Sequence, residues 1–312
     1  MKKVIGLLML SLMSTAVLAQ EKITIYFNAG VNQPNYAPYL RMLDIANKNQ
    51  KKYQFLIEPK PGANGLLAIK AMDQSPESSL ATQAPSFVEN ARSGAINEQD
   101  YVAVSAQGDA CWAVITNVGN TAQGIASLRG QREITVGGTG FGNVAHLTAL
   151  TIGDRYGFNV RYIVYKANYD ALLNMASGEK INFVIERVQN YQTFKTRNPD
   201  LQILGMSCAK RHPQMPEVKT LAEQGITVPT IFFVTIANTR MPASKRQEIE
   251  SILEQAQSEL GQDFLIESAD LQPPQFAKPK VSANKYFEQR VNQIKTPLLK
   301  FQAQIERSKE GN

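Results

Sequence analysis

The sequence predicts an α/β protein in which strands and helices alternate along the chain. Short runs rich in β-branched and aromatic residues recur, and most are followed by a loop and an amphipathic helix. Some of these runs are apolar throughout, which favours strands buried on both faces of a parallel sheet. The 312 residues, 43% of them hydrophobic, suffice for one large domain or two medium domains with cores of their own. In such folds ligands lie at the carboxyl ends of the strands.

Two strand–helix units are predicted first. Lys22–Phe27 alternates apolar and polar residues as a strand does, and the polar loop Asn28–Asn35, which carries glycine and proline, leads to a helix over Leu40–Ala46. Tyr53–Glu58 is the second predicted strand, and a proline- and glycine-rich turn separates it from a helix over Leu66–Met72. The arrangement therefore repeats.

The middle of the chain contributes three more predicted strands before a longer strand–turn–helix segment. Leu80–Ala84 and Val102–Ala106 are short strands, and Cys111–Thr116 is an apolar run that we expect to be buried on both faces of a parallel sheet. The segment Glu133–Gly153 then reads as a short strand, a glycine-rich turn and a helix.

The alternation continues beyond this segment. Val160–Tyr165, Ile181–Glu186 and Leu201–Met206 are predicted strands, and a helix around Tyr169–Ala176 lies between the first two. We expect the sheets of this protein to be parallel, because strands that alternate with helices usually pair in that way.

Two helices are predicted at the C-terminal end. The first begins at Ser244, which is a good N-cap residue, and ends at Gly261. The second runs from about Ser282 into the last residues, with a break or kink near Pro297, because proline removes a helical hydrogen bond.

The glycine-rich turn has the composition of an anion-binding site. Gly137, Gly138, Gly140 and Gly142 would let backbone N–H groups approach a bound group closely. The helix that follows begins near Asn143–His146, where unpaired N–H donors and the positive end of the helix dipole favour an anion. His146 itself fits either direct ligand contact or a hydrogen bond with a nearby backbone group.

The first nineteen residues have the three-part pattern of a secretory signal. Lys2 and Lys3 precede an apolar run over Val4–Leu12, and a cleavage site is predicted after Ala19. We expect a bacterial export signal and therefore a periplasmic protein. The formal net charge of +6 is mild and the basic residues are scattered, so no nucleic-acid-binding surface is predicted.

Two cysteines, Cys111 and Cys208, are present in the chain. An oxidising compartment permits them to form a disulfide, but two buried free thiols fit the sequence equally well. The alternatives stay open at the level of sequence.

Signals for catalysis and for metal binding are weak. Gly205–Ala209 approaches the GxSxG pattern of hydrolases and His212 follows it, but the second glycine is missing. The GGTGFG turn has neither the spacing of a dinucleotide fingerprint nor the lysine of a phosphate loop. The chain has two histidines and neither HExxH nor CxxC. We predict no catalytic residue, no metal site and no cofactor.

Four segments occur in one order that resembles a known family: Lys60–Gly65, Val136–His146, Tyr165–Gly178 and Pro216–Gly225. Together they resemble the extracytoplasmic solute receptors of tripartite tricarboxylate transporters, the Bug-type or TctC-like receptors. Their patterns run PGAGG, GSxGxGSxxH, VPYKG and PxVPTxAExG. The resemblance covers nearly the whole mature chain.

The resemblance implies a two-domain periplasmic binding protein, type II-like, with two crossover strands and the ligand in the cleft between the domains. One domain would hold residues 20–116 and 238–312, and the other 117–237. Such receptors are not enzymes. The implied function is capture of a small carboxylate, such as a dicarboxylate or tricarboxylate, an aromatic acid or an amino acid. The implied partners are the inner-membrane permease subunits, with the receptor itself a monomer. A subunit that senses the ligand and signals to a membrane partner is the alternative.

In this family one loop from each domain holds a ligand carboxylate, which implies contacts from Phe27–Asn35 and from Thr139–Asn143. The first loop departs from the family pattern, since its second glycine, its aspartate and a downstream arginine are missing. Glu186 lies near a family aspartate and is either a cleft carboxylate or an exposed charge paired with Arg187 or Lys180. The predicted ligand-binding residues are Asn28, Ala29, Gly30, Asn32, Ser86, Thr139, Gly140, Phe141, Gly142, Asn143 and Glu186.

Overall fold

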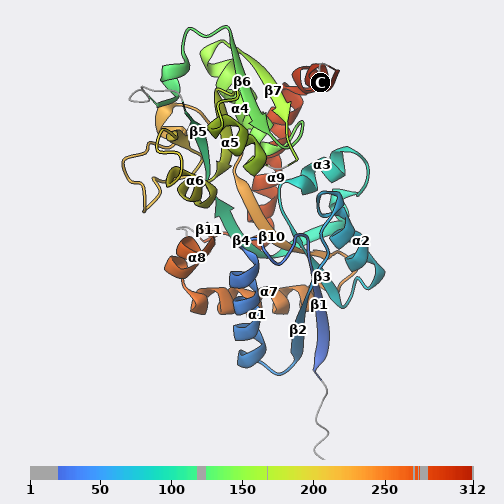
Figure 1. The fold of residues 1–312 in the computed structure, drawn as a ribbon. Helices are drawn as coiled ribbons and strands as arrows, with labels where there is room; N and C mark the ends of the chain where they lie inside the picture. The colour runs from blue at the N-terminus through green and yellow to red at the C-terminus, as the bar shows by residue number, and fades with distance from the viewer. Residues whose placement is uncertain are drawn as a thin grey trace, which may run out of the picture.

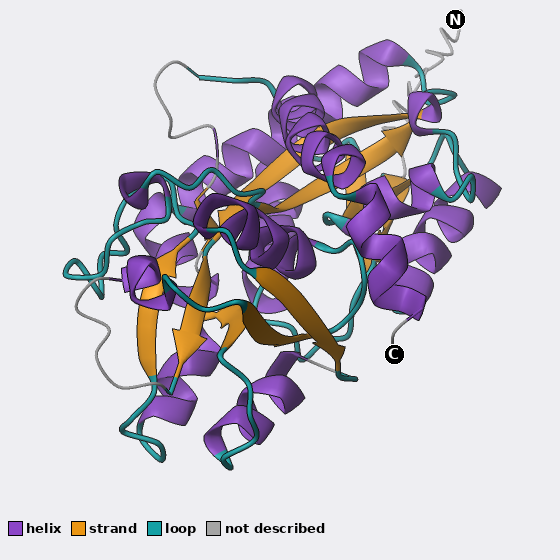
Figure 2. Cartoon of the chain, turned by 90° about the horizontal axis from the view of Figure 1, so that it is seen from above, coloured by secondary structure: helices purple, strands orange, loops and turns teal. Residues whose placement is uncertain are grey.

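The chain folds into two β-sheets with helices packed around both (Figures 1 and 2). The structure is a computed structural model that describes residues 20–117, 124–166, 168–269, 271–272, 274 and 280–310. The predicted export signal, residues 1–19, lies outside the described residues. None of the described helices has the length and apolar character needed to cross a membrane.

The first sheet has six strands in the order β11-β4-β10-β3-β1-β2. Its strands are β1 (Glu21–Phe27), β2 (Tyr53–Pro59), β3 (Ser79–Gln83), β4 (Tyr101–Ala110), β10 (Ile231–Asn238) and β11 (Leu271–Gln272). The second sheet has five strands in the order β7-β6-β8-β5-β9. They are β5 (Trp112–Thr116), β6 (Glu133–Gly138), β7 (Asn159–Val164), β8 (Phe183–Arg187) and β9 (Gln202–Met206).

Helices separate most of the strands. The α-helices are α1 (Tyr36–Asn49), α2 (Leu66–Gln74), α3 (Ser86–Arg92), α4 (Val144–Tyr156), α5 (Asn168–Ala176), α6 (Val188–Lys195), α7 (Ala243–Leu260), α8 (Gln262–Ala269), α9 (Ala283–Lys300) and α10 (Gln302–Glu310). Short 3₁₀ turns are η1 (Ala63–Gly65), η2 (Glu98–Asp100), η3 (Gly124–Leu128) and η4 (Ala222–Gln224).

Both sheets are mixed, so the expectation of parallel sheets is wrong in part. Parallel pairing joins β1 to β2 and β3, and β6 to β7 and β8. However, β10 is antiparallel to β3 and β4, and β5 is antiparallel to β8 and β9. The apolar run Cys111–Thr116 reflects burial on both faces, and a central strand is buried in this way whatever its direction.

The chain passes from the first sheet to the second at Cys111. Cys111 separates β4 of the first sheet from β5 of the second, and Cys208 follows β9, before the chain returns to the first sheet at β10. Cys111 and Cys208 form a disulfide with a Cα–Cα distance of 4.9 Å. The division of the chain into residues 20–116 with 238–312 and residues 117–237 stays a prediction.

Helix α9 extends along both parts of the molecule (Figure 1). Near its beginning, the ring centroid of Phe287 lies 5.0 Å from that of Phe87 in α3 and 5.9 Å from that of Phe232 in β10 of the first sheet. Toward its end, Leu298 belongs to the same buried cluster as Leu147 of α4, beside the second sheet. One continuous apolar cluster therefore joins the two parts.

One predicted helix boundary is wrong, and a predicted break lies a few residues beyond its expected position. Ser244 is not the N-cap of α7, because the helix already begins at Ala243 after Pro242, whose side chain makes no cap hydrogen bond. Helix α9 continues through Pro297 to Lys300, and the break before α10 lies at Phe301. The helix at Ser282 does begin as predicted, and the Ser282 hydroxyl accepts the Lys285 N–H at 3.4 Å.

Candidate functional site

A cavity of about 300 Å³ lies between the loop that joins β6 to α4, on the second sheet, and the beginning of α3, on the first. It is lined by Asn64, Pro85, Ser86, Val88, Glu89, Thr139, Gly140, Phe141, Gly142, Asn143, Val144, Lys166, Ile294 and Leu298. The structure thus brings together six predicted ligand-binding residues: Ser86, Thr139, Gly140, Phe141, Gly142 and Asn143.

Hydrogen bonds of its own side chains stabilise the β6–α4 loop. The Asn143 side chain caps α4, since its Oδ1 accepts the His146 N–H at 2.9 Å. Its Nδ2 donates to the Thr139 hydroxyl at 3.1 Å, which fixes the other end of the loop. No hydrogen bond within the described part of the chain uses the N–H groups of Gly140 and Phe141. These donors and the N-terminus of α4 lie at the cavity, an arrangement that suits an anion.

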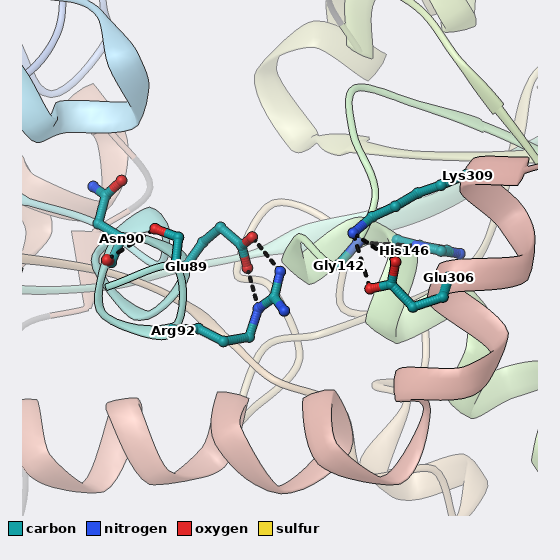
Figure 3. A network of polar contacts seen from close by, with 8 residues as sticks. Glu89, Asn90, Arg92, Gly142, His146, Glu306 and Lys309 are labelled. Atoms are coloured by element: carbon teal, nitrogen blue, oxygen red, sulfur yellow. Dashed lines mark hydrogen bonds and ion pairs between the residues drawn. The ribbon is translucent and has the colours of Figure 1, made fainter. Parts of the chain in front are cut away.

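His146 supports the loop from behind. It is fully buried, and its Nδ1 accepts the Gly142 N–H at 3.0 Å (Figure 3). The centroid of its ring lies 4.2 Å from the ring centroid of Tyr162 and 5.6 Å from that of Phe141. Burial lowers the pKa of His146 to about 4, because the charged form loses its hydration. A hydrogen bond with a nearby backbone group was one of the two interpretations of this residue, and it is confirmed.

The four glycines of the β6–α4 segment, Gly137, Gly138, Gly140 and Gly142, differ in why a side chain is excluded or allowed. A Cβ on Gly138 would lie 1.9 Å from the Tyr162 hydroxyl, and one on Gly137 would lie 2.9 Å from the Ala171 Cβ, so both are required by packing. Gly142 has a φ of +77°, which L-residues with a side chain rarely adopt. Gly140 has neither constraint, because a Cβ there would meet its nearest atom, the Asn143 Nδ2, at 3.7 Å.

The opposite wall begins at the N-terminus of α3, where Ser86 lines the cavity. Three residues further on, the Glu89 carboxylate accepts two hydrogen bonds from Arg92, at 2.6 and 3.0 Å (Figure 3). The buried Asn90 donates from its Nδ2 to the Asn64 carbonyl at 3.0 Å. This bond holds η1, where Ala63 and Asn64 have positive φ angles, against the cavity.

Lys166 is the positively charged side chain at this cavity. It lies two residues beyond the end of β7 and is exposed at the cavity lining. Among the residues that the structure describes, it forms no ion pair. Its ammonium group is therefore available to a ligand.

The predicted residues of the first loop lie outside this cavity. Asn28, Ala29, Gly30 and Asn32 follow the carboxyl end of β1 and are not among the lining residues. The Asn28 N–H donates to the Thr82 hydroxyl at 2.9 Å, and that hydroxyl donates back to Asn28 Oδ1 at 3.0 Å. These contacts attach the loop to β3 of the first sheet.

Glu186 also lies outside the cavity lining. It is buried at the end of β8, so the interpretation as an exposed charge is wrong. Its Oε1 accepts the Arg187 N–H at 2.6 Å. Burial raises the pKa of the Glu186 carboxyl, and hydrogen bonds from the Arg187 backbone and the Asn190 side chain partly offset that effect.

Residues of the near-GxSxG segment have structural partners. The Ser207 hydroxyl accepts the Trp112 N–H at 2.8 Å, and the neighbouring Cys208 is in the disulfide. His212 accepts the Gln214 N–H at its Nδ1, at 3.2 Å. Within the described residues, no group of three or more His, Cys, Asp or Glu side chains could hold a metal ion.

Sequence reasoning missed several lining residues. Asn64 and Lys166 lie within two of the four segments that carry the family resemblance, so a signal was present. Glu89 lies on α3, which is too short for its periodicity to be read. Ile294 and Leu298 come from α9, about 150 residues beyond the loop in sequence, and no local pattern connects them to it.

A larger hollow of about 600 Å³ lies elsewhere, between α4, β7 and α10. None of the eleven predicted ligand-binding residues lines it. Its lining includes charged side chains of both signs, among them Asp154, Arg161 and Arg307. The smaller cavity remains the better candidate, because the glycine-rich loop and the start of α4 open into it.

Comparison with known proteins adds a family and several solved folds. A family model described as "Tripartite tricarboxylate transporter family receptor" matches residues 39–296. No curated protein matches the sequence.

Three solved structures illustrate the shared fold. A TctC solute-binding protein from Polaromonas, determined without ligand, is 15% identical, with a TM-score of 0.72 over 88% of this chain and 96% of that chain. MatC from Rhodopseudomonas palustris, with bound malate, is 15% identical, with a TM-score of 0.62 over 88% of this chain and 97% of its own. An R. palustris protein with adipate is 16% identical, with a TM-score of 0.66 over 92% and 97%. These likenesses confirm the predicted fold class.

Proposed function

Because the chain belongs to the family of tripartite tricarboxylate transporter receptors, we propose that it captures a small carboxylate in the cavity between α3 and the β6–α4 loop. Receptors of this family bind solutes and are periplasmic. The ligand would pass from this receptor to the permease subunits in the inner membrane. The receptor itself would act as a monomer, exported by the signal at residues 1–19.

The observation that carries this proposal is the set of donors at the start of α4. The N–H groups of Gly140 and Phe141 have no acceptor within the described residues, and the positive end of the α4 dipole lies beside them. A carboxylate there would accept charge-assisted hydrogen bonds, which are stronger than bonds between neutral groups. The malate and adipate of the two related structures are carboxylates as well.

The opposite face of the cavity would hold the rest of the ligand. Ser86 on that face offers a hydroxyl, and Lys166, which follows β7 of the second sheet on the loop side, offers an ammonium group. We further propose that the two lobes, one built on each sheet, move toward each other when the ligand binds. This closure would bring Asn28–Asn32 and Glu186 nearer to the ligand. Their contact with the ligand stays a prediction.

Thermal-shift screening of the purified mature protein tests the proposal. The panel would contain malate, adipate, citrate, benzoate and amino acids, each with an uncharged analogue. A ligand that binds only the folded protein raises the melting temperature by several degrees when its concentration is about 100 times its Kd. If only uncharged compounds raise the melting temperature, the proposed carboxylate site is wrong.

Replacement of Lys166 gives a second, sharper test. Lys166→Gln should weaken carboxylate binding by about fivefold, since one partly exposed charge contributes on the order of 1 kcal/mol. Lys51→Gln is the matched control, because Lys51 is an exposed lysine in the turn before β2, outside the cavity lining. Equal affinities of the two variants would remove Lys166 from the site.

A further inference from the structure

The two sides of the cavity differ in chemistry. The loop side presents backbone N–H groups, and Lys166 adds a positive charge. The other side combines the polar Ser86 and Glu89 of α3 with a wall of buried apolar side chains from α3, α4 and α9. These are Val88, Val144, Ile294 and Leu298, each no more than 7% exposed. A ligand that fits this cavity therefore has one charged end and one apolar part.

The charge of the lining limits how many carboxylates the cavity can accommodate. Lys166 is a cation without an ion-pair partner among the described residues, whereas Glu89 is already paired with Arg92 through two hydrogen bonds. Arg92 lies outside the lining, but its guanidinium neutralises the Glu89 carboxylate, so Lys166, Glu89 and Arg92 together carry a net charge of about +1. One ligand carboxylate balances this charge. A second would be left uncompensated.

We infer that the cavity takes a monocarboxylic acid with an apolar body, in preference to a dicarboxylate or tricarboxylate. This inference rests on the proposed function and names the substrate class of the same site. With the first carboxylate at Gly140 and Phe141, a second one at the far end of the ligand would lie against Ile294 and Leu298. It would lose its hydration there without gaining a hydrogen bond.

Placement of the second carboxylate near α3 is no better. The Glu89 carboxylate lines the cavity there, and two carboxylates at short distance repel each other. Arg92 is already engaged by both Glu89 oxygens. The volume of about 300 Å³ lies at the small end of small-molecule sites, so a short aliphatic or a single-ring acid fits.

Isothermal titration calorimetry with three six-carbon compounds tests this inference. Hexanoate and adipate have the same chain length and differ in the second carboxylate, and 1-hexanol has none. We expect hexanoate to bind at least about tenfold more tightly than adipate, because an apolar pocket disfavours a ligand that carries an additional polar group. Adipate binding as tightly as hexanoate or more tightly would overturn the inference and leave the carboxylate receptor intact. Hexanol binding as tightly as hexanoate, or no binding of either acid, would overturn both.

A variant of the apolar wall provides an independent measurement. Val88→Thr keeps the shape of the side chain and places a hydroxyl in the wall, so the hexanoate-to-adipate affinity ratio should fall by about threefold or more. Should this variant fail to fold, Val144→Thr makes the same change at another residue of the wall, the first residue of α4. An unchanged ratio in the folded variant would show that this wall does not contact the ligand body and would overturn the inference.

Discussion

Gly140 and Gly142 lie two residues apart in the β6–α4 loop, and they are expected to respond differently to substitution. A Cβ on Gly140 would meet no atom closer than 3.7 Å, so Gly140→Val should change the free energy of unfolding by less than about 1 kcal/mol. Its side chain would enter the cavity and obstruct the donor groups there, so affinity should fall by at least about tenfold.

Gly142→Ala is the matched comparison for Gly140→Val. Its φ of +77° costs a residue with a Cβ on the order of 1–2 kcal/mol, and the Cβ would lie 3.4 Å from Leu298 Cδ1. Urea unfolding and calorimetry of the two variants measure both quantities. Unchanged affinity in Gly140→Val would remove this loop from the binding site.

His146 should make the stability of the protein depend on pH. Its folded pKa of about 4 lies below the ordinary value of 6.5, so protonation favours the unfolded state. The stabilisation is complete above pH 6.5 and is lost as the pH falls from 6.5 toward 4. Between about pH 7 and about pH 5 the loss should be about 2 kcal/mol, since one pKa unit corresponds to about 1.4 kcal/mol.

Comparison with His146→Gln isolates this contribution. A glutamine side chain can still accept the Gly142 N–H but does not titrate, so its unfolding free energy should fall less over the same pH range. Urea denaturation at several pH values measures both proteins. Parallel pH profiles for the two would show that His146 does not carry the effect.

At the scale of the element, α4 both ends the loop and offers its N-terminus to the ligand. Asn143→Asp should retain the cap, because aspartate also accepts the His146 N–H and its charge suits the helix dipole. Its negative charge would repel a carboxylate in the cavity, so affinity should fall by about tenfold or more at nearly unchanged stability.

Asn143→Ser and Asn143→Ala complete the set. Serine retains a cap without charge but lacks the Nδ2 donor to Thr139, so it should keep the affinity and most of the stability, whereas alanine should lose about 1 kcal/mol of stability. Thermal unfolding and calorimetry provide the two measurements. Carboxylate binding by Asn143→Asp with the affinity of the wild type would contradict the role of the α4 N-terminus.

Strands and long helices could be predicted from sequence because each is encoded locally. Tyr53–Glu58, for example, differs from β2 by one residue at its end. The direction of β5 could not be predicted, since the apolar run records burial and not the pairing partner. Helix α3 was missed, because its seven residues hold less than two turns and its N-cap, Pro85, makes no side-chain cap hydrogen bond.

At the scale of the whole molecule, one side of the cavity comes from a single sequence segment, and the other side comes from residues that only the tertiary fold brings there. Thr139–Asn143 could be identified because glycines, a cap residue and a helix start are contiguous. Ile294 and Leu298 reach the same cavity only because α9 extends along both sheets. The pairing of Cys111 with Cys208 likewise depends on the tertiary fold, with 97 residues of sequence between them.

Trp112 should report movement of the two parts of the molecule. It is the only tryptophan of the chain, it opens β5 directly after the passage between the sheets, and it packs against apolar clusters of both parts. Half-buried indole emission depends on solvent contact, so lobe closure on a bound ligand should shift the emission of the wild type. The fluorescence midpoint should equal the Kd from calorimetry. If calorimetry shows saturation while the emission stays constant, the ligand is bound without closure around Trp112. The binding cleft would then be preformed, and the proposed closure of the two lobes would be wrong.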